Sequence, residues 1–207
     1  MNKGSLFIIS GPSGSGKDTI LSEVLKACDN LQFSISTVSR PMQEGEKQGE
    51  KYNFVTRDEF IELINNDMLL EYNEYCGNYY GTPRAYVEEC IDHGKNIMIE
   101  VDVNGAANIR RLIPEAVSVF IMPPSLQVLR DRLFSRGRES SDVIDKRFAQ
   151  ARSEIQRASE YDYIIVNDVL EEAVDDFLAI IRSHQLKTEK NIKLINEVIS
   201  DVESCDR

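Results

Sequence analysis

The sequence has few residues of the kinds that build disulfide scaffolds or zinc sites. Its four cysteines are scattered along 207 residues with no C-x-x-C pair, and its two histidines are His93 and His184. This spacing excludes a disulfide framework and the common zinc motifs, and it predicts reduced thiols. No apolar run reaches the length of a transmembrane helix, and the first apolar segment is too short for a signal peptide. We therefore expect a cytoplasmic protein with no membrane partner.

Positive charge is also scarce. The chain has 24 Lys and Arg against 35 Asp and Glu, a formal net charge of −11. Nucleic-acid binding needs a basic surface, so nucleic acid is not an expected partner. A phosphate site must then be a local basic pocket within an acidic surface. The length suits one domain with insertions or two small domains.

Residues 6–19, LFIISGPSGSGKDT, give the clearest functional signal. The short apolar run predicts a buried parallel strand, and the helical spacing of apolar residues after Lys17 predicts a helix. Between strand and helix, G-x-x-x-x-G-K indicates a phosphate-binding loop, in which backbone N–H groups, the helix N-terminus and the lysine all face phosphate oxygens. The residues assigned to ATP here are Gly11, Pro12, Ser13, Gly14, Ser15, Gly16, Lys17, Asp18 and Thr19.

One position in this loop departs from the pattern. Asp18 follows the lysine, where a Ser or Thr hydroxyl normally binds Mg²⁺. A carboxylate can also hold the ion, but it adds a negative charge near the triphosphate. Phosphate binding is still expected, whereas the way the metal is held does not follow from the motif.

The rest of the chain alternates strand and helix patterns, which predicts an α/β fold with a parallel sheet of the P-loop NTPase type and helices on both faces. The expected strands are residues 33–38, 52–55, 68–75, 96–101, 117–122 and 163–166; the expected helices are 57–66, 84–93, 105–113, 125–134, 143–160 and 171–183. Residues 77–83, GNYYGTP, are interpreted as a turn. Two polar regions interrupt the alternation and predict a small mixed α+β subdomain over 33–83 and a helical lid over 125–159, around a core of 1–32, 84–124 and 160–207.

A series of motifs over nearly the whole chain resembles the guanylate kinase family of P-loop nucleoside monophosphate kinases. After GPSGSGK come the 36–52 segment, LLEYNEYCGNYYGTP, IEVDVNGA, FIMPPS, RLFSRGR, KRF and YDYIIVND. The resemblance implies transfer of the ATP γ-phosphoryl group to GMP, and to dGMP, giving ADP and GDP in purine nucleotide metabolism with Mg²⁺ as cofactor. It also implies that 33–83 binds GMP. Monomer and homodimer both stay open.

The resemblance also assigns roles to individual residues. Lys17 and the lid arginines Arg132, Arg136 and Arg147 are implied to stabilise the transferred phosphoryl group. The residues implied to hold the GMP phosphate are Arg40, Tyr52 and Tyr80; those implied to face guanine are Ser36, Glu71, Thr82 and Glu100. Asp102, through water, and Asp18 are implied metal ligands, and Asn167 is implied to lie beside adenine.

These roles are chemically consistent. The acceptor phosphate has a second pKa of about 6 and is largely dianionic near neutral pH, so no protein base is required. Glu71 can accept hydrogen bonds from guanine N1–H and the 2-amino group, while Ser36 and Thr82 can donate to O6. Adenine has the opposite polarity at position 6 and lacks the 2-amino group, so it would leave these groups unpaired.

Two other functions are compatible with parts of the sequence. One is a non-catalytic guanylate-kinase-like module that binds proteins; such modules tend to lack the loop lysine and the lid arginines, which this chain has. The other is a kinase acting on a different phosphorylated acceptor, such as a ribose phosphate. The guanine-facing set argues against it, whereas Asp18 and Gln43 leave it open.

Gln43 yields the first testable prediction. It occupies the second arginine position of the acceptor motif, and Val38 and Ser39 replace the usual two threonines. A lost charge-assisted contact is typically worth about 1.5–3 kcal/mol, so GMP should bind more weakly than the motif suggests, unless Lys47 compensates. We expect Gln43→Arg to lower the Michaelis constant for GMP in a steady-state assay. An unchanged constant would contradict this interpretation.

Overall fold

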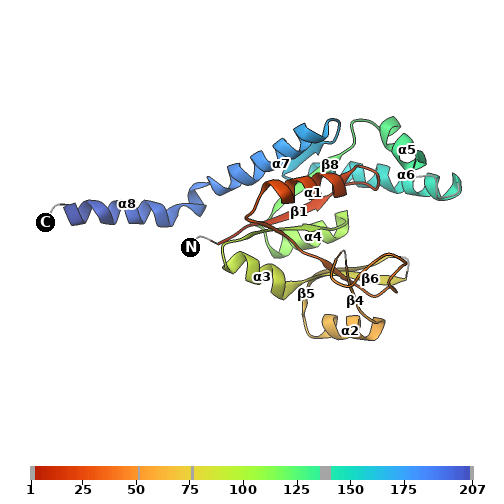
Figure 1. Ribbon diagram of the computed structural model, residues 1–207, viewed down its shortest axis with the longest axis horizontal. Coiled ribbons are helices and arrows are strands. Elements are labelled where there is room, and N and C mark those ends of the chain that lie inside the picture. The colour runs from red at the N-terminus through yellow and green to blue at the C-terminus, as the bar shows by residue number, and fades with distance from the viewer. Residues whose placement is uncertain (1–2, 51, 76, 136–140, 206–207) are drawn as a thin grey trace.

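The computed structural model describes residues 3–50, 52–75, 77–135 and 141–205, and its core is a parallel sheet (Figure 1). The strands of this sheet lie in the order β2-β7-β1-β8-β9, and every pair is parallel. They are β1 (Leu6–Ser10), β2 (Leu31–Phe33), β7 (Asn96–Glu100), β8 (Val117–Met122) and β9 (Tyr163–Val166). The predicted α/β fold is confirmed.

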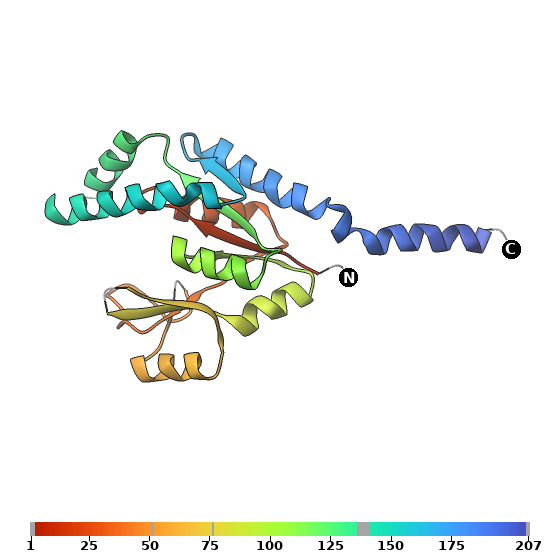
Figure 2. The same ribbon diagram turned by 180° about the vertical axis from the view of Figure 1, so that it is seen from behind.

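Helices cover both faces of this sheet (Figures 1 and 2). Phe7 and Ile9 of β1 pack with α1 (Lys17–Ala27) and α7 (Leu170–Gln185). The alternate residues Leu6 and Ile8 pack on the other face, with α3 (Arg84–Asp92) and α4 (Val103–Leu112). Burial on both faces explains why β1 is continuously apolar rather than alternating.

A second, mixed sheet lies beside the core. Its order is β4-β3-β6-β5, with β3 and β4 parallel and the other pairs antiparallel. The strands are β3 (Ser36–Val38), β4 (Tyr52–Phe54), β5 (Leu69–Tyr75) and β6 (Asn78–Pro83). Helix α2 (Arg57–Asn65) packs on it through Phe60, whose ring stacks on Tyr79 at 5.3 Å. All four strands fall inside the stretch predicted to form a mixed subdomain.

The prediction of one strand over 33–38 is wrong. The chain forms two short strands there, β2 in the core sheet and β3 in the mixed sheet. The backbone N–H of Ser34 still donates to Met98 O of the core sheet at 2.9 Å, and the chain then crosses to the other sheet. The alternation of apolar and polar residues runs on through the crossing at residues 33–36, so it does not reveal which sheet each residue joins.

The prediction of a turn over 77–83 is also wrong. Apart from Gly77 (φ 76°), the segment is β6, which pairs with β5 in a hairpin. Gly81 suggests a turn in the sequence, but in the structure it allows β6 to pack closely against β5 and α2. A Cβ at Gly81 would lie 3.0 Å from both the Glu71 carbonyl oxygen and the Phe60 ring. Pro83 ends the strand, as expected for a residue without an N–H.

Helix α5 (Leu126–Ser135) follows its prediction with shifted ends. The stretch predicted as a helix over 143–160 is α6 (Ser141–Gln156) followed by the 3₁₀ turn η1 (Arg157–Glu160). A second 3₁₀ turn, η2 (Thr188–Lys190), and helix α8 (Ile192–Cys205) come after α7. Ser125 caps the N-terminus of α5, because its Oγ accepts from the Val128 N–H at 3.1 Å. Helix α4 begins before the predicted residue 105, because the Asp102 side chain caps it.

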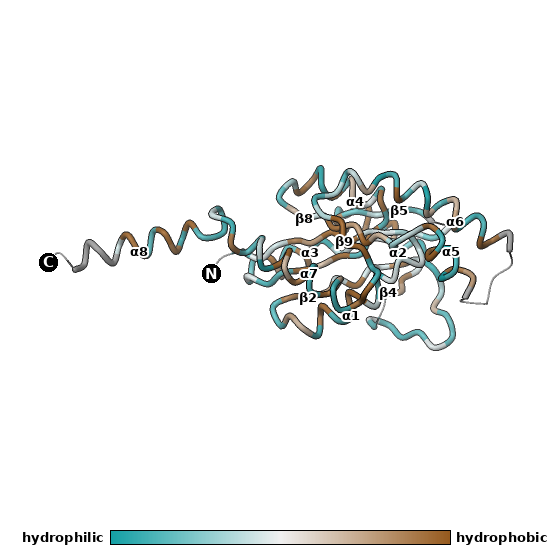
Figure 3. The backbone as a smooth tube through the Cα atoms, turned by 90° about the horizontal axis from the view of Figure 1, so that it is seen from above, coloured by the Kyte–Doolittle hydropathy of each residue, from teal (hydrophilic) through white to brown (hydrophobic). Residues whose placement is uncertain are grey.

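Helix α8 extends away from both sheets (Figures 1 and 3). It carries exposed apolar side chains, among them Ile195 and Val198. Within the described ranges, no helix has both the length and the apolar character that crossing a bilayer requires.

The buried His184 gives a prediction about stability. Its ring packs edge-on against Phe7 at 5.9 Å, and its pKa is lowered mainly by burial, with repulsion from Lys187 and Lys190. The folded protein therefore favours the neutral ring. Stability should be intact above about pH 6.5, the unfolded pKa, and should fall as the pH drops through the lower folded pKa.

We expect His184→Phe to lose less unfolding free energy than the wild type between about pH 7 and about pH 5, as measured by urea denaturation. His93→Gln, a change at the exposed histidine, is the control and should follow the wild type. Equal losses in His184→Phe and the wild type would contradict the assignment.

Candidate active site

Three glycines with left-handed backbone shape the loop between β1 and α1. Gly11, Gly14 and Gly16 have φ angles of 155°, 89° and 87°. A Cβ at Gly11 would lie 2.4 Å from Ile121 O, and one at Gly16 would lie 2.2 Å from Asn167 Nδ2. Side chains are therefore excluded by sterics as well as by conformation. Lys17, at the start of α1, donates to Gly11 O at 2.7 Å and lies 3.5 Å from Glu100 Oε1.

Two predicted site residues, Asn167 and Arg132, bind the backbone of this loop through hydrogen bonds. The buried Asn167 donates from Nδ2 to Ser15 O at 2.6 Å. Arg132 of α5 donates to Asn167 O at 3.1 Å and to Ser15 O at 3.4 Å. In this structure the Asn167 amide is therefore committed to the loop; its place beside adenine stays a prediction.

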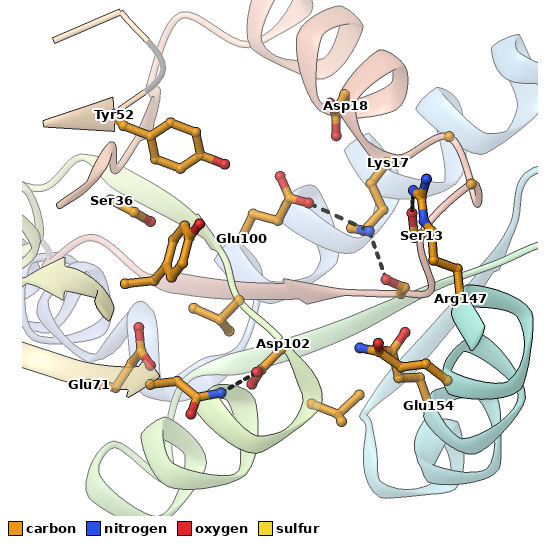
Figure 4. Close-up of a pocket in the computed structure, with 18 of the residues that line it drawn as sticks. Ser13, Lys17, Asp18, Ser36, Tyr52, Glu71, Glu100, Asp102, Arg147 and Glu154 are labelled. Carbon is orange, nitrogen blue, oxygen red and sulfur yellow. Dashed lines mark hydrogen bonds and ion pairs between the residues drawn. The ribbon is translucent and has the colours of Figure 1, made fainter. Parts of the chain in front are cut away.

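Helix α6 closes the phosphate end of the site. Arg147 donates to Ser13 Oγ, and Glu154 lies on the same cavity wall (Figure 4). Gln150 also lines the cavity, and positions three and seven residues after Arg147 share one face of the helix. Gln150 donates to Glu154 Oε1 at 2.8 Å, and burial raises the pKa of Glu154. The sequence analysis missed Gln150 and Glu154, although their spacing from Arg147 was readable. Arg136 lies outside the described residues.

A partly buried carboxylate lies at the opposite end of the site. Glu71 of β5 accepts from Thr82 Oγ1 of β6 at 2.9 Å. Burial raises the pKa of Glu71 to about 7, and the charge of Asp102 adds to the effect. Gly105 makes room for this side chain, since a Cβ there would lie 2.9 Å from Glu71 Oε2.

Arg40 packs against the Tyr52 ring and does not itself line the cavity. Its guanidinium donates to both carboxylate oxygens of Glu46, at 2.6 and 2.7 Å, and lies 5.2 Å from the centre of the Tyr52 ring. The hydrogen bonds to Glu46 raise the pKa of Arg40, and the Tyr80 hydroxyl contributes to the same increase. The Gln43 backbone N–H donates to Glu46 at 2.8 Å. Glu46 was not identified from the sequence.

A single cavity of about 620 Å³ connects the two ends (Figure 4). The predicted site residues on its wall are Gly11, Ser13, Gly14, Gly16, Lys17, Asp18, Thr19, Ser36, Tyr52, Glu71, Tyr80, Glu100, Asp102 and Arg147. Pro12, Ser15, Arg40, Thr82, Arg132 and Asn167 are outside this wall. The wall residues that the sequence analysis missed are Phe33, Asn73, Gly81, Val101, Val103, Gln150 and Glu154.

The carboxylates of the wall are dispersed. In the part of the chain that the structure describes, no three Asp, Glu, His or Cys side chains are grouped closely enough to bind a metal by themselves. Asp102 caps α4, accepting from the N–H groups of Asn104 and Gly105. One or two carboxylates together with substrate phosphates and water suit Mg²⁺, so Asp18 and Asp102 fit an ion that arrives with a nucleotide.

The site consists of a strand, a glycine loop and a helix, with a lysine at the cavity wall and arginines around the loop. This arrangement defines a P-loop protein that binds a phosphorylated nucleotide. The guanylate kinase family model matches residues 3–184. The chain is 43% identical to the guanylate kinase of Oceanobacillus iheyensis over 96% of this chain and 97% of that protein. It is 46% identical to the guanylate kinase of Vibrio parahaemolyticus over 92% and 93%.

A solved structure agrees with these matches. The crystal structure of guanylate kinase from Anaplasma phagocytophilum superposes with a TM-score of 0.75 at 34% identity, covering 91% of this chain and 89% of that one. The chain therefore belongs to the guanylate kinase family and is a nucleoside monophosphate kinase.

The raised pKa of Glu71 predicts a pH dependence for the acceptor. If Glu71 faces guanine, as the family resemblance implies, it must be ionised to accept from the base, so it should lose its proton when GMP binds near neutral pH. The dissociation constant of GMP should therefore rise as the pH falls from about 8 to about 6, approaching tenfold per unit below the pKa.

Calorimetry in buffers of different ionisation enthalpy would measure the proton release. The Glu71→Gln variant is the comparison, because only the GMP phosphate still titrates there. Equal proton release by wild type and variant would contradict the assignment.

Proposed function

We propose that this chain transfers the γ-phosphoryl group of ATP to GMP, giving ADP and GDP. The observation that carries the proposal is the continuous cavity between the phosphate loop at Lys17 and the partly buried carboxylate of Glu71. An acceptor nucleotide can bind with its base at Glu71 and its phosphate toward the loop. A donor triphosphate on the loop is then in line with it, which is the arrangement phosphoryl transfer requires.

The base end supports guanine as the ligand. Thr82 Oγ1 donates to one oxygen of Glu71, which leaves the other available as an acceptor. Guanine presents N1–H and N2–H donors together, and a carboxylate can accept from both. Ser36, on the same wall, can donate to O6. Adenine would leave these buried groups unpaired, and such mismatches are strongly discriminated.

The residues at the phosphate end supply charge rather than a base. The acceptor phosphate is the nucleophile and is largely ionised near neutral pH. Lys17 is already directed at the loop, and its contacts with Gly11 O and Glu100 can be exchanged for phosphate oxygens. Arg147 and Arg132, together with Arg136, are proposed to stabilise the negative charge that spreads over the transferred group.

Mg²⁺ is the proposed cofactor, and when bound it would offset the negative charge of the donor phosphates. Asp102 would hold it through water, and Asp18 is the second candidate. The positions of both side chains on the cavity wall support this assignment.

The wider assignments are proposals of the same kind. Residues 33–83 form the acceptor subdomain and 125–159 a lid that excludes water, around a core of 1–32, 84–124 and 160–207. dGMP serves as a second acceptor, since the assigned side chains face base and phosphate rather than the ribose 2′-hydroxyl. The role is in purine nucleotide metabolism, as a monomer or homodimer. A cytoplasmic location stays a prediction.

A coupled assay of ADP release with ATP and Mg²⁺ tests the reaction. We expect turnover with GMP and little with AMP or a ribose bisphosphate. Lys17→Met should lower kcat by about 100-fold or more, because it removes a cation that faces the transferred group.

Lys26→Met is the matched control, since Lys26 lies on the same helix but is exposed and paired with Glu23. It should retain wild-type turnover. Turnover of the ribose bisphosphate but not GMP would reassign the acceptor, and no turnover with any acceptor would overturn the proposal.

A further inference from the structure

Asn73 joins the mixed sheet to the core at the wall of the cavity. Its Nδ2 donates to Asp102 Oδ2 at 2.5 Å. The other oxygen of Asp102 accepts from the backbone N–H groups of Asn104 and Gly105, at 2.9 and 2.7 Å. The carboxylate is therefore held from two sides, by the first turn of α4 and by a side chain of β5.

The same junction carries the base-reading carboxylate. Glu71 and Asn73 are two residues apart on β5, so they lie on the same face of the strand, and both line the cavity. Glu71 packs against Gly105 in the first turn of α4, and the backbone N–H of Gly105 is one of the two that Asp102 caps. The mixed sheet and the core therefore meet at the place where Glu71 of β5 and Asp102 approach each other.

The chemistry of the pair fixes the direction of the hydrogen bond. An ionised carboxylate can only accept, so Asn73 must present its amide N–H to Asp102. An alanine at 73 would take this donor away, and an aspartate would place a third carboxylate beside Glu71 and Asp102. A negative charge placed beside other carboxylates raises their pKa values.

We propose that Asn73 is a positioning residue for the acceptor: by holding Asp102 it fixes the place of β5, and of Glu71, relative to the core. This inference rests on the proposed function and deepens it. Asn73 acts through Asp102, whose proposed link to the donor is only through Mg²⁺. The loss of Asn73 should therefore weaken GMP binding and leave the binding of ATP without Mg²⁺ unchanged.

Calorimetric titration of the full-length protein with GMP alone and with ATP alone tests this. We expect Asn73→Ala to raise the dissociation constant of GMP about tenfold, the usual scale for one hydrogen bond to a charged group, with no change for ATP. Glu74→Gln is the matched control: it changes the next residue of β5, on the opposite face, where the half-exposed Glu74 contacts Arg57 at 3.4 Å. It should bind GMP as the wild type does.

Two further variants separate positioning from general support. In the Asp102→Asn background, where the side chain can still cap α4, Asn73→Ala should cause little additional loss. Asn73→Asp should move the pH below which GMP binding weakens to a higher value, because the added carboxylate raises the pKa of Glu71. Additive losses in the double variant, or an unshifted pH profile, would overturn the proposal.

A measurement without nucleotide keeps the inference separate from the reaction. Amide hydrogen exchange at Asn104 and Gly105 should be faster in Asn73→Ala than in the wild type, since Asp102 loses one of its restraints. Unchanged exchange would overturn the inference even if GMP is the acceptor. Failure of the wild type to bind GMP would instead overturn the proposed function, and the exchange result would still decide the role of Asn73.

Discussion

The close approach of Asn167 to the phosphate loop is the constraint on which the site depends. The Asn167 amide binds Ser15 O and fills the space that a side chain at Gly16 would need. Arg132 binds both partners from α5. The left-handed glycines and the N-terminus of α1 are therefore held in place by a residue that follows β9, far along the chain. Donors fixed in this way need little reorganisation when phosphate arrives, which is the main source of electrostatic catalysis.

The charge of the cavity sets a second constraint. Among the described residues of the wall, five are carboxylates and two are cationic. The carboxylates are Asp18, Glu71, Glu100, Asp102 and Glu154; the cations are Lys17 and Arg147. Two polyanionic nucleotides cannot be brought together in such a field without added positive charge. The proposed reaction would therefore need a divalent ion that arrives with the donor, together with the lid arginines, because the cavity wall lacks sufficient positive charge of its own.

Most of the core was predictable from the sequence, because its signals are local. A buried parallel strand, a glycine loop and an amphipathic helix are each encoded within a few residues, as at residues 6–19. The crossing within 33–38 was missed because both strands have the same pattern and only long-range pairing separates them. β6 was missed because Gly81 serves close packing against β5 rather than a turn. Asn73 and Glu154 could have been found only from their spacing to predicted site residues: Asn73 shares a strand face with Glu71, and Glu154 shares a helix face with Arg147.

The acceptor-phosphate end shows why a motif does not define a site by itself. A guanidinium has five N–H donors, and Arg40 uses three of them on Glu46 and on Pro41 O. Glu46 also accepts from the backbone of Gln43, where the family motif would place a second arginine. In the proposed function, Arg40 would therefore have to serve both the internal carboxylate of Glu46 and the incoming phosphate. Tyr80 contacts Arg40 and also lines the cavity. Arg40 can therefore act on a bound acceptor through the hydroxyl of Tyr80.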